Sequence, residues 1–283
     1  MVYYGIITLS VVMFGVQFLI SDRYEKAMGN SAASVFTLSL LSSLAGLACL
    51  FVINRFRLEF SRFTVLVAVL AAVNILLFSL CSLRALSRID LSLYSLFSML
   101  GGMMLPFLAG LVFYREPMTP GKAVCVVLVV SALLLTIDPR GKRGGTVYYC
   151  GVFVFNGMSG VLSKFFESAP FAKTSAAGYS MWISAITALF SMIGLILFRS
   201  KPKKLSLRAL VLALCSGSMG QVANYLLLIA LAVLPASVQY PFVTGGVMIV
   251  STLLAAFTGQ KPSKTEIFTV GLSFLGILAL VLL

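Results

Sequence analysis

The chain has 283 residues, of which 60% are hydrophobic and only 10% are charged. A soluble globular domain carries about a quarter of charged residues, so this composition excludes a cytosolic enzyme and a secreted disulfide scaffold and predicts an integral membrane protein. The formal charge of +13 comes from basic residues that lie in short clusters between apolar runs. This pattern favours contact with anionic lipid headgroups and excludes nucleic acid as a partner.

Ten apolar runs follow one another along the chain, and each is long enough to cross the hydrocarbon core as a helix, which takes about 20 residues. The breaks between them carry charge, proline, glycine or asparagine, as at Ser21-Asp22-Arg23. We therefore predict an all-α polytopic membrane protein with ten transmembrane helices. The expected spans are 2–20, 31–53, 62–86, 89–114, 119–137, 146–167, 173–199, 206–232, 236–258 and 263–283.

The two halves of the chain resemble each other at a shift of 145 residues. Because each half holds five spans, an odd number, the second half must enter the membrane inverted. We expect a first five-helix repeat at 1–138, a linker at 139–145 and an inverted repeat at 146–283. Inverted repeats with a site at their interface are typical of secondary transporters. The matched pairs include Phe97 with Phe242, Gly101 with Gly246 and Pro117 with Pro262.

Short motifs around the fourth and ninth spans resemble those of the drug/metabolite transporter superfamily, EamA type. In the first half they are Arg84-Ala85-Leu86-(x)2-Ile89, Pro106, and Arg115-Glu116-Pro117-Met118-Thr119. In the second half they are Ala230-Leu231-(x)3-Pro235-Ala236-Ser237 and Gln260-Lys261-Pro262-Ser263. Glu116 matches the usual glutamate of the family, whereas Lys261 replaces its second copy. The resemblance implies a carrier of the bacterial cytoplasmic (inner) membrane that works by alternating access, with both termini in the cytoplasm.

The distribution of basic residues gives the opposite orientation. With cytoplasmic termini, only seven of the 21 Lys and Arg residues lie on the cytoplasmic side. Cytoplasmic loops normally carry the excess of positive charge. The count therefore favours external termini, and the orientation is left open between the two indications. The seven residues are Arg55, Arg57, Arg62, Arg115, Lys122, Lys164 and Lys173.

Polar side chains inside the expected spans are the candidate substrate-binding residues, because a polar group in hydrocarbon needs a partner or a wet cavity. We expect amide, hydroxyl and aromatic groups to converge on a midplane pocket, with Arg84 as a counter-charge for a carboxylate or phosphate. Interhelical hydrogen bonding is the alternative for the uncharged groups, and snorkelling to the headgroups is the alternative for Arg84. The candidates are Asn74, Arg84, Tyr94, Ser98, Asn156, Trp182, Gln221, Asn224, Tyr225, Tyr240 and Thr244.

Helix-weakening residues mark two spans as candidate hinges. Gly101, Gly102 and Pro106 lie in the fourth span, and Pro241 lies near the start of the ninth. Tight packing through small residues is the alternative. One charged pair is also expected: Lys164 precedes Glu167 by three residues, a spacing that places both side chains on one helical face.

The chain has no histidine, and its eight acidic residues lie at or near span ends. We therefore expect no enzyme activity, metal or cofactor, and no proton-coupled export of cations. The sequence favours a secondary transporter for a small polar organic metabolite, first an amino acid or related zwitterion. One alternative is an organic-cation carrier with an aromatic cage of Tyr94, Tyr225 and Tyr240; another is a non-transporting membrane scaffold. The expected partners are the substrate and membrane lipid, and the chain is expected to be a monomer or homodimer.

Overall fold

The computed structural model describes residues 2–29, 31–86, 91–135, 146–197, 205–257 and 264–282. Within these ranges the chain forms ten α-helices and no strand. Of these helices, α1, α2, α3, α7, α8 and α9 contain segments long and apolar enough to cross a membrane, so the protein is a helical membrane protein. The helices are α1 (Val2–Met28), α2 (Ala32–Ile53), α3 (Arg62–Leu86), α4 (Leu91–Val112), α5 (Pro120–Leu135), α6 (Thr146–Ser168), α7 (Ala176–Leu197), α8 (Leu207–Leu231), α9 (Ala236–Phe257) and α10 (Lys264–Leu282).

The end of α1 differs from the expected one. The predicted break at Ser21-Asp22-Arg23 is wrong, because the helix continues to Met28 and the chain reverses at Gly29, with φ of 79°. Within the additional turns, Lys26 Nζ lies 2.6 Å from the Asp22 carboxylate, a pair that supports helix. Tyr24 and Met28 are buried against α8. Local charge therefore extends the helix here instead of ending it.

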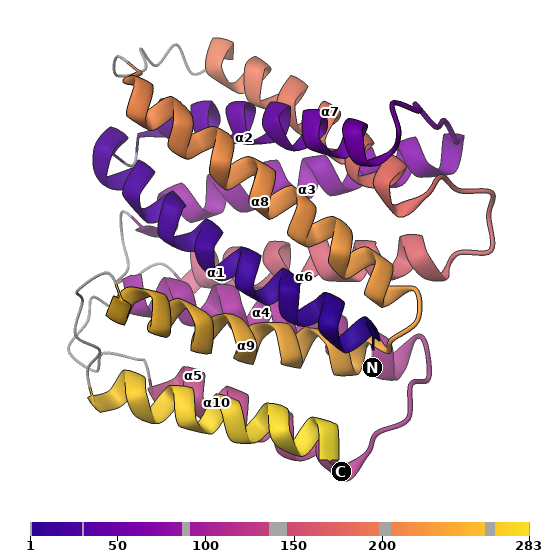
Figure 1. Ribbon diagram of the computed structural model, residues 1–283, viewed down its shortest axis with the longest axis vertical. Coiled ribbons are helices and arrows are strands. Elements are labelled where there is room, and N and C mark those ends of the chain that lie inside the picture. Colours follow the sequence, from indigo (N-terminus) through magenta and orange to yellow (C-terminus); the bar gives the residue numbers. More distant parts are fainter. Residues whose placement is uncertain are drawn as a thin grey trace.

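Helices of the first half of the chain pack mainly on helices of the second half. The helix α1 contacts α8 and α9, α2 contacts α7 and α8, α3 contacts α6 and α7, α4 contacts α6 and α9, and α5 contacts α10. Figure 1 shows the bundle as an elongated stack, with α2, α3 and α7 at one end and α5 and α10 at the other. Residues far apart in the sequence thus surround the middle of the bundle.

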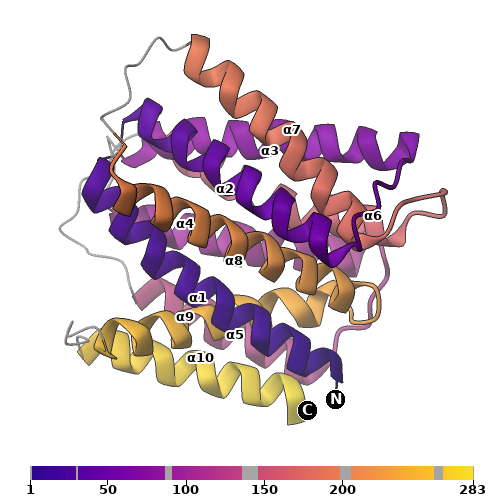
Figure 2. The same cartoon turned by 45° about the horizontal axis from the view of Figure 1, so that its top comes forward.

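The start of α1 and the end of α10 lie on the same side of the bundle, as both views show (Figures 1 and 2). The connections 54–61, 113–119, 169–175 and 232–235 lie on this side as well. We call it the N-terminal side. The features described below lie in the middle of the bundle and at this side.

Glycines permit the closest helix crossings. A Cβ atom added to Gly101 of α4 would lie 2.1 Å from the backbone oxygen of Phe153 in α6. A Cβ atom added to Gly217 of α8 would lie 2.2 Å from the Cα atom of Ser42 in α2. Small residues at these points let two backbones meet directly, as is common in membrane proteins. The position of Gly101 thus matches the packing alternative, and its role as a hinge stays a prediction.

Prolines lie inside two helices that continue past them. Pro106 lies within α4 and Pro241 within α9. Because proline has no N–H group, the carbonyl groups of Gly102 and Ser237, four residues earlier, do not receive the usual helical hydrogen bond. Each helix is therefore weakened at one turn, as the expected hinges require, although bending at these turns stays a prediction.

The crossing of α4 and α6 yields a test by substitution. We expect Gly101→Ala to lower the free energy of unfolding by about 1–3 kcal/mol, because the added methyl group overlaps the backbone of α6. The control is Gly271→Ala in α10, where no atom lies within 4 Å of an added Cβ. Alanine favours helix over glycine by about 1 kcal/mol, so the control protein should be unchanged or more stable. Thermal unfolding of the purified variants measures both effects, and equal unfolding temperatures would contradict the assignment.

Candidate functional site

A cavity of about 530 Å³ lies in the middle of the bundle, between α1, α3 and α4 of the first half and α6, α7, α8 and α9 of the second. Its apolar wall includes Phe14, Phe18, Phe78 and Met99. No charged side chain lines the cavity among the residues that the structure describes. The polar lining side chains are Gln17, Asn156, Ser159, Ser163, Tyr179, Ser180, Gln221, Asn224, Gln239, Tyr240 and Thr244.

The candidate residues of the sequence analysis, both binding and hinge residues, divide into three groups by their position relative to the cavity. Six of the named candidates line the cavity: Gly102, Asn156, Gln221, Asn224, Tyr240 and Thr244. Others are absent from its described lining: Asn74, Ser98, Gly101, Pro106, Trp182, Tyr225 and Pro241. Arg84 and Tyr94 lie in α3 and α4, but their side chains fall outside the described residues.

Two asparagines connect α6 to its neighbours through hydrogen bonds. The amide of Asn74 in α3 donates to the carbonyl oxygen of Phe155 at 2.8 Å and to the Ser159 hydroxyl at 2.9 Å. The amide of Asn156 in α6 donates to the carbonyl oxygen of Ser98 in α4 at 2.6 Å. Interhelical bonding therefore accounts for Asn74 and Ser98 without a substrate, whereas Asn156 both joins helices and lines the cavity.

The single tryptophan lies at the N-terminal side and packs against the connection between α2 and α3. Its indole N–H donates to the carbonyl oxygen of Glu59 at 2.9 Å. The ring lies edge-on to Phe60, with centroids 6.0 Å apart. Both contacts are to the connection between α2 and α3, so they support packing for Trp182 rather than contact with a ligand.

Several lining residues were not among the expected pocket residues. Tyr179 and Ser180 lie in the first turns of α7, and Gln239 lies in the first turn of α9. The sequence pattern does not select them, because which face of a helix meets the cavity depends on the packing of distant helices. One signal was present: Gln239 precedes Val243 and Val247 by one and two helical turns, and all three share the cavity face.

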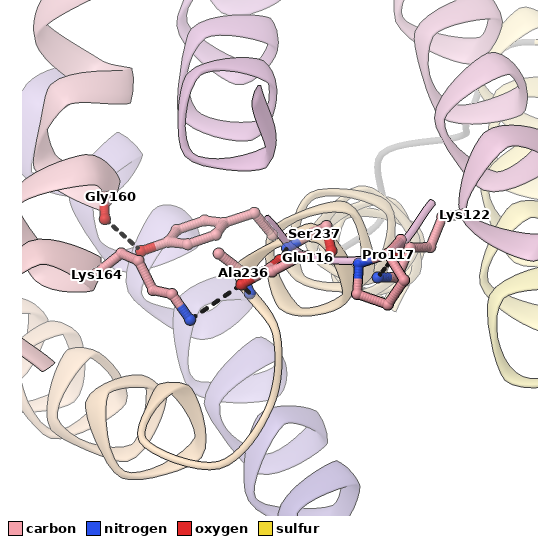
Figure 3. A network of polar contacts seen from close by, with 8 residues as sticks. Glu116, Pro117, Lys122, Gly160, Lys164, Ala236 and Ser237 are labelled. Carbon is pink, nitrogen blue, oxygen red and sulfur yellow. Dashed lines mark hydrogen bonds and ion pairs between the residues drawn. The ribbon is translucent and has the colours of Figure 1, made fainter. Parts of the chain in front are cut away.

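The cavity is bounded on the N-terminal side by a group of polar contacts centred on Glu116 (Figure 3). Tyr240 lines the cavity and donates its hydroxyl to the carbonyl oxygen of Gly160 at 3.0 Å. One helical turn farther toward the N-terminal side, Lys164 Nζ lies 3.0 Å from a Glu116 carboxylate oxygen. The Glu116 carboxylate accepts the backbone N–H groups of Ala236 and Ser237 at 2.9 and 2.8 Å. One carboxylate therefore joins the end of α4, the end of α6 and the start of α9.

Local backbone geometry directs this carboxylate. Arg115, directly before it, has φ of 51° and reverses the chain after α4. The N–H of Glu116 then returns to the carbonyl oxygen of Gly110 at 3.0 Å. A Cβ atom on Gly110 would lie 2.6 Å from a Glu116 carboxylate oxygen, so glycine leaves the space that the side chain occupies. The glutamate that the family resemblance selected is thus fixed in place over the first N–H groups of α9.

A second glutamate performs the same role for α7. Glu59, between α2 and α3, accepts the backbone N–H of Ser175 at 2.6 Å and its hydroxyl at 2.8 Å. The Ser175 hydroxyl in turn accepts the N–H of Gly178, as an N-cap residue does. A carboxylate at a helix N-terminus satisfies free N–H groups and interacts favourably with the helix dipole. Both glutamates belong to the first half of the chain, and both helices belong to the second.

The environments of the two glutamates favour their charged forms. Burial raises the pKa of Glu116, but hydrogen bonds from Ser237 and the contact with Lys164 outweigh this effect and hold the pKa below its usual range. Burial also raises the pKa of Glu59, but the hydrogen bonds from Ser175 and Asn54 lower it more. Both groups are therefore carboxylates at neutral pH.

The expected pairing of Lys164 with Glu167 is not the one observed. Lys164 forms its ion pair with Glu116, and Glu167 lies 3.7 Å from Lys173 Nζ. Both side chains of the Lys164–Glu116 pair are nearly buried, with 11% and 8% exposed. A charge so far from water needs a close counter-charge, and Glu116 supplies it from another helix end. Sequence spacing alone reveals neighbours within one helix and not partners across the bundle.

The Glu116 contacts predict a large effect of a small change. Removing one partner of a buried ion pair costs about 3–5 kcal/mol, because it leaves the other charge uncompensated. We expect Glu116→Gln to lower the free energy of unfolding by an amount of this order, and Glu116→Gln with Lys164→Met to lose less than the sum of the single changes. The control is Asp22→Asn, which breaks an exposed pair and should cost under about 1 kcal/mol. Additive single and double changes in denaturant unfolding would contradict the pairing.

The charge of Glu116 also predicts a dependence on pH. Because its pKa is lowered in the folded protein, its contribution to stability is complete above the ordinary carboxyl pKa of about 4.3 and is lost as the pH falls through the folded value. The difference in unfolding temperature between the wild type and Glu116→Gln should thus be constant near neutral pH and shrink below about pH 4. A difference that does not change with pH would show that the ionisation of Glu116 is irrelevant.

Comparisons with known proteins identify the fold and nothing more specific. No protein-family model and no curated protein matches the chain. Among solved structures 29 chains match. One crystal structure has a TM-score of 0.75 to this chain and is 16% identical in sequence. The match covers 98% of this chain and 95% of the other. At this identity the likeness shows a shared fold, and it leaves the family and the activity to be inferred from the site.

Proposed function

We propose that the protein is a secondary transporter of a small polar organic molecule without net charge, which binds in the central cavity and crosses by alternating access. The observation that carries the proposal is the cavity itself: about 530 Å³, lined by amide, hydroxyl and aromatic groups from both halves. Cavities of this volume hold small organic ligands. Its described lining has no charged residue, which favours an amino acid, a related zwitterion or an un-ionised molecule over an organic cation or an anion.

Ten spans in two inverted repeats form part of this proposal. The principal helix contacts support it. When each helix of α1–α5 is exchanged with the helix five places later in α6–α10, the contact of α1 with α8 becomes that of α6 with α3, and the structure contains both. The same exchange converts α4 with α6 into α9 with α1, and leaves α2 with α7 and α4 with α9 unchanged. Secondary transporters place their substrate site between two such repeats. Membership in the EamA-type drug/metabolite transporters, and a place in the bacterial inner membrane, belong to the same proposal.

Alternating access requires that the N-terminal side opens in one state. Opening there would separate Glu116 from α9 and Lys164, and the prolines of α4 and α9 weaken the two helices that meet at this point. A scaffold protein has no need of a central polar cavity between its halves, so the cavity supports a carrier over that alternative.

Counterflow in proteoliposomes tests the proposal. Vesicles loaded with a millimolar unlabelled compound are diluted into a trace of the labelled compound, over a panel of amino acids, organic acids, nucleosides, sugar phosphates and quaternary amines. A carrier should accumulate label transiently for one chemical class, whereas a channel or a scaffold should not. Absence of counterflow across the whole panel, with protein that unfolds cooperatively, would contradict the proposal.

The helix α8 contains a polar residue that lines the cavity and another, one turn later, that serves as its control. Gln221 lines the cavity, and Tyr225, one turn later, is absent from its described lining. We expect Gln221→Met, which keeps the length of the side chain and removes the amide, to raise KM for the counterflow substrate about tenfold. Tyr225→Phe should leave KM unchanged. If both variants transport like the wild type, Gln221 is not a binding residue.

A further inference from the structure

Three buried polar atoms at one end of the cavity have no hydrogen-bond partner within the described part of the protein. They are the Tyr179 hydroxyl, the Ser180 hydroxyl and the side-chain oxygen of Gln239. All three residues line the cavity, and their exposed fractions are 0%, 3% and 0%. An atom that is buried without a partner destabilises the ligand-free protein. A group of them on one cavity wall indicates a site for a polar ligand group.

Contacts around these residues place them at the same end of the cavity. The amide nitrogen of Gln239 donates to the carbonyl oxygen of Leu227 at 3.0 Å. The next residue, Leu228, packs in one cluster with the ring of Tyr179. Ser180 follows Tyr179 directly. Tyr179 and Ser180 lie near the start of α7 and Gln239 near the start of α9, both at the N-terminal side, and Leu227 and Leu228 of α8 connect them.

The three unpaired atoms determine which hydrogen-bond donors and acceptors the ligand group must carry. Because the Gln239 nitrogen donates to Leu227, its oxygen is fixed as an acceptor, so the ligand must bring a hydrogen-bond donor. The hydroxyl groups of Tyr179 and Ser180 can each donate, so the ligand must also bring an acceptor. A group that carries N–H and C=O side by side meets both demands.

The lack of charged side chains in the described lining further limits the class of ligand. A carboxylate or ammonium group loses several kcal/mol on leaving water unless a counter-charge meets it, and the described lining has none. The remainder of the cavity is apolar at Phe14, Phe18 and Phe78, which suits an aromatic or aliphatic body.

We propose that Tyr179, Ser180 and Gln239 form a subsite for an un-ionised amide group carried on an apolar body, and that the transported substrate belongs to this class. The inference rests on the proposed function and narrows it from any molecule without net charge to one without ionised groups.

Four probes that share one skeleton and differ in charge test the subsite. They are N-acetyl-L-phenylalaninamide, which is neutral, L-phenylalanine, which is zwitterionic, N-acetyl-L-phenylalanine, which is anionic, and L-phenylalaninamide, which is cationic. Binding to the full chain in lipid nanodiscs is measured by calorimetry and by the rise in unfolding temperature. We expect the neutral probe to bind at least about tenfold more tightly than each of the others.

Variants test two of the three atoms, the hydroxyl groups of Tyr179 and Ser180. Tyr179→Phe keeps the ring stacked on Phe166, where the centroids lie 3.9 Å apart, and Ser180→Ala removes only a hydroxyl group. Each should weaken binding of the neutral probe about tenfold without lowering the unfolding temperature of the ligand-free protein. The matched control is Thr187→Val, which removes another buried hydroxyl group of α7 without a partner, but one absent from the described cavity lining. Its binding should equal that of the wild type.

The outcomes separate this inference from the proposed function. Tightest binding by the zwitterion, equal weakening by Thr187→Val, or no binding of any probe would overturn the amide subsite. Counterflow of another compound that Tyr179→Phe and Ser180→Ala do not change would also overturn it, while leaving the carrier intact. If the neutral probe binds through these residues and counterflow fails for it and for the whole panel, the subsite stands and the transport function falls.

Discussion

Helix N-termini at the membrane border need hydrogen-bond acceptors, and this protein supplies two of them as carboxylates from the opposite half of the chain. Glu116 accepts N–H groups at the start of α9, and Glu59 accepts that of Ser175 at the start of α7. At the nearly buried Glu116 carboxylate, where the protein excludes water, water cannot replace the acceptor. The relative position of the two halves, and with it the cavity between them, depends on these bonds.

The remaining polar groups of the interior serve two purposes. The amides of Asn74 and Asn156 are used in bonds between α3, α4 and α6. Tyr240 uses its hydroxyl to hold Gly160 at the boundary of the cavity. Tyr179 and Ser180 near the start of α7, and Gln239 near the start of α9, each have a polar atom without a partner among the described residues. Most of these polar atoms are thus paired, and three of the unpaired atoms among the described residues line the cavity.

The sequence predicts most helix bounds within a few residues, because apolar runs of membrane length leave few alternatives. It misplaces the end of α1, where Asp22 and Lys26 stabilise a turn that their charge was expected to break. Of the residues that line the cavity, it selects Asn156, Gln221, Asn224, Tyr240 and Thr244 as polar residues inside spans. It does not find Tyr179, Ser180 and Gln239, since which face of a helix meets a cavity depends on crossings between distant segments. For the same reason the partner of Lys164 could not be read from its neighbours in the chain.

The capping of second-half helices by first-half glutamates has a consequence for the order in which the protein is made. Glu116 precedes Ser237 by 121 residues, and a ribosome adding about 5–20 residues per second needs about 6 to 24 seconds to cover that distance. Glu59 waits a similar time for Ser175, 116 residues later. Until Ser175 has been made, the Glu59 carboxylate lacks this N–H partner, and until Ser237 has been made, the Glu116 carboxylate lacks its partner at α9. Final packing of the early helices is therefore a late event in biogenesis, coupled to insertion of α7 and α9.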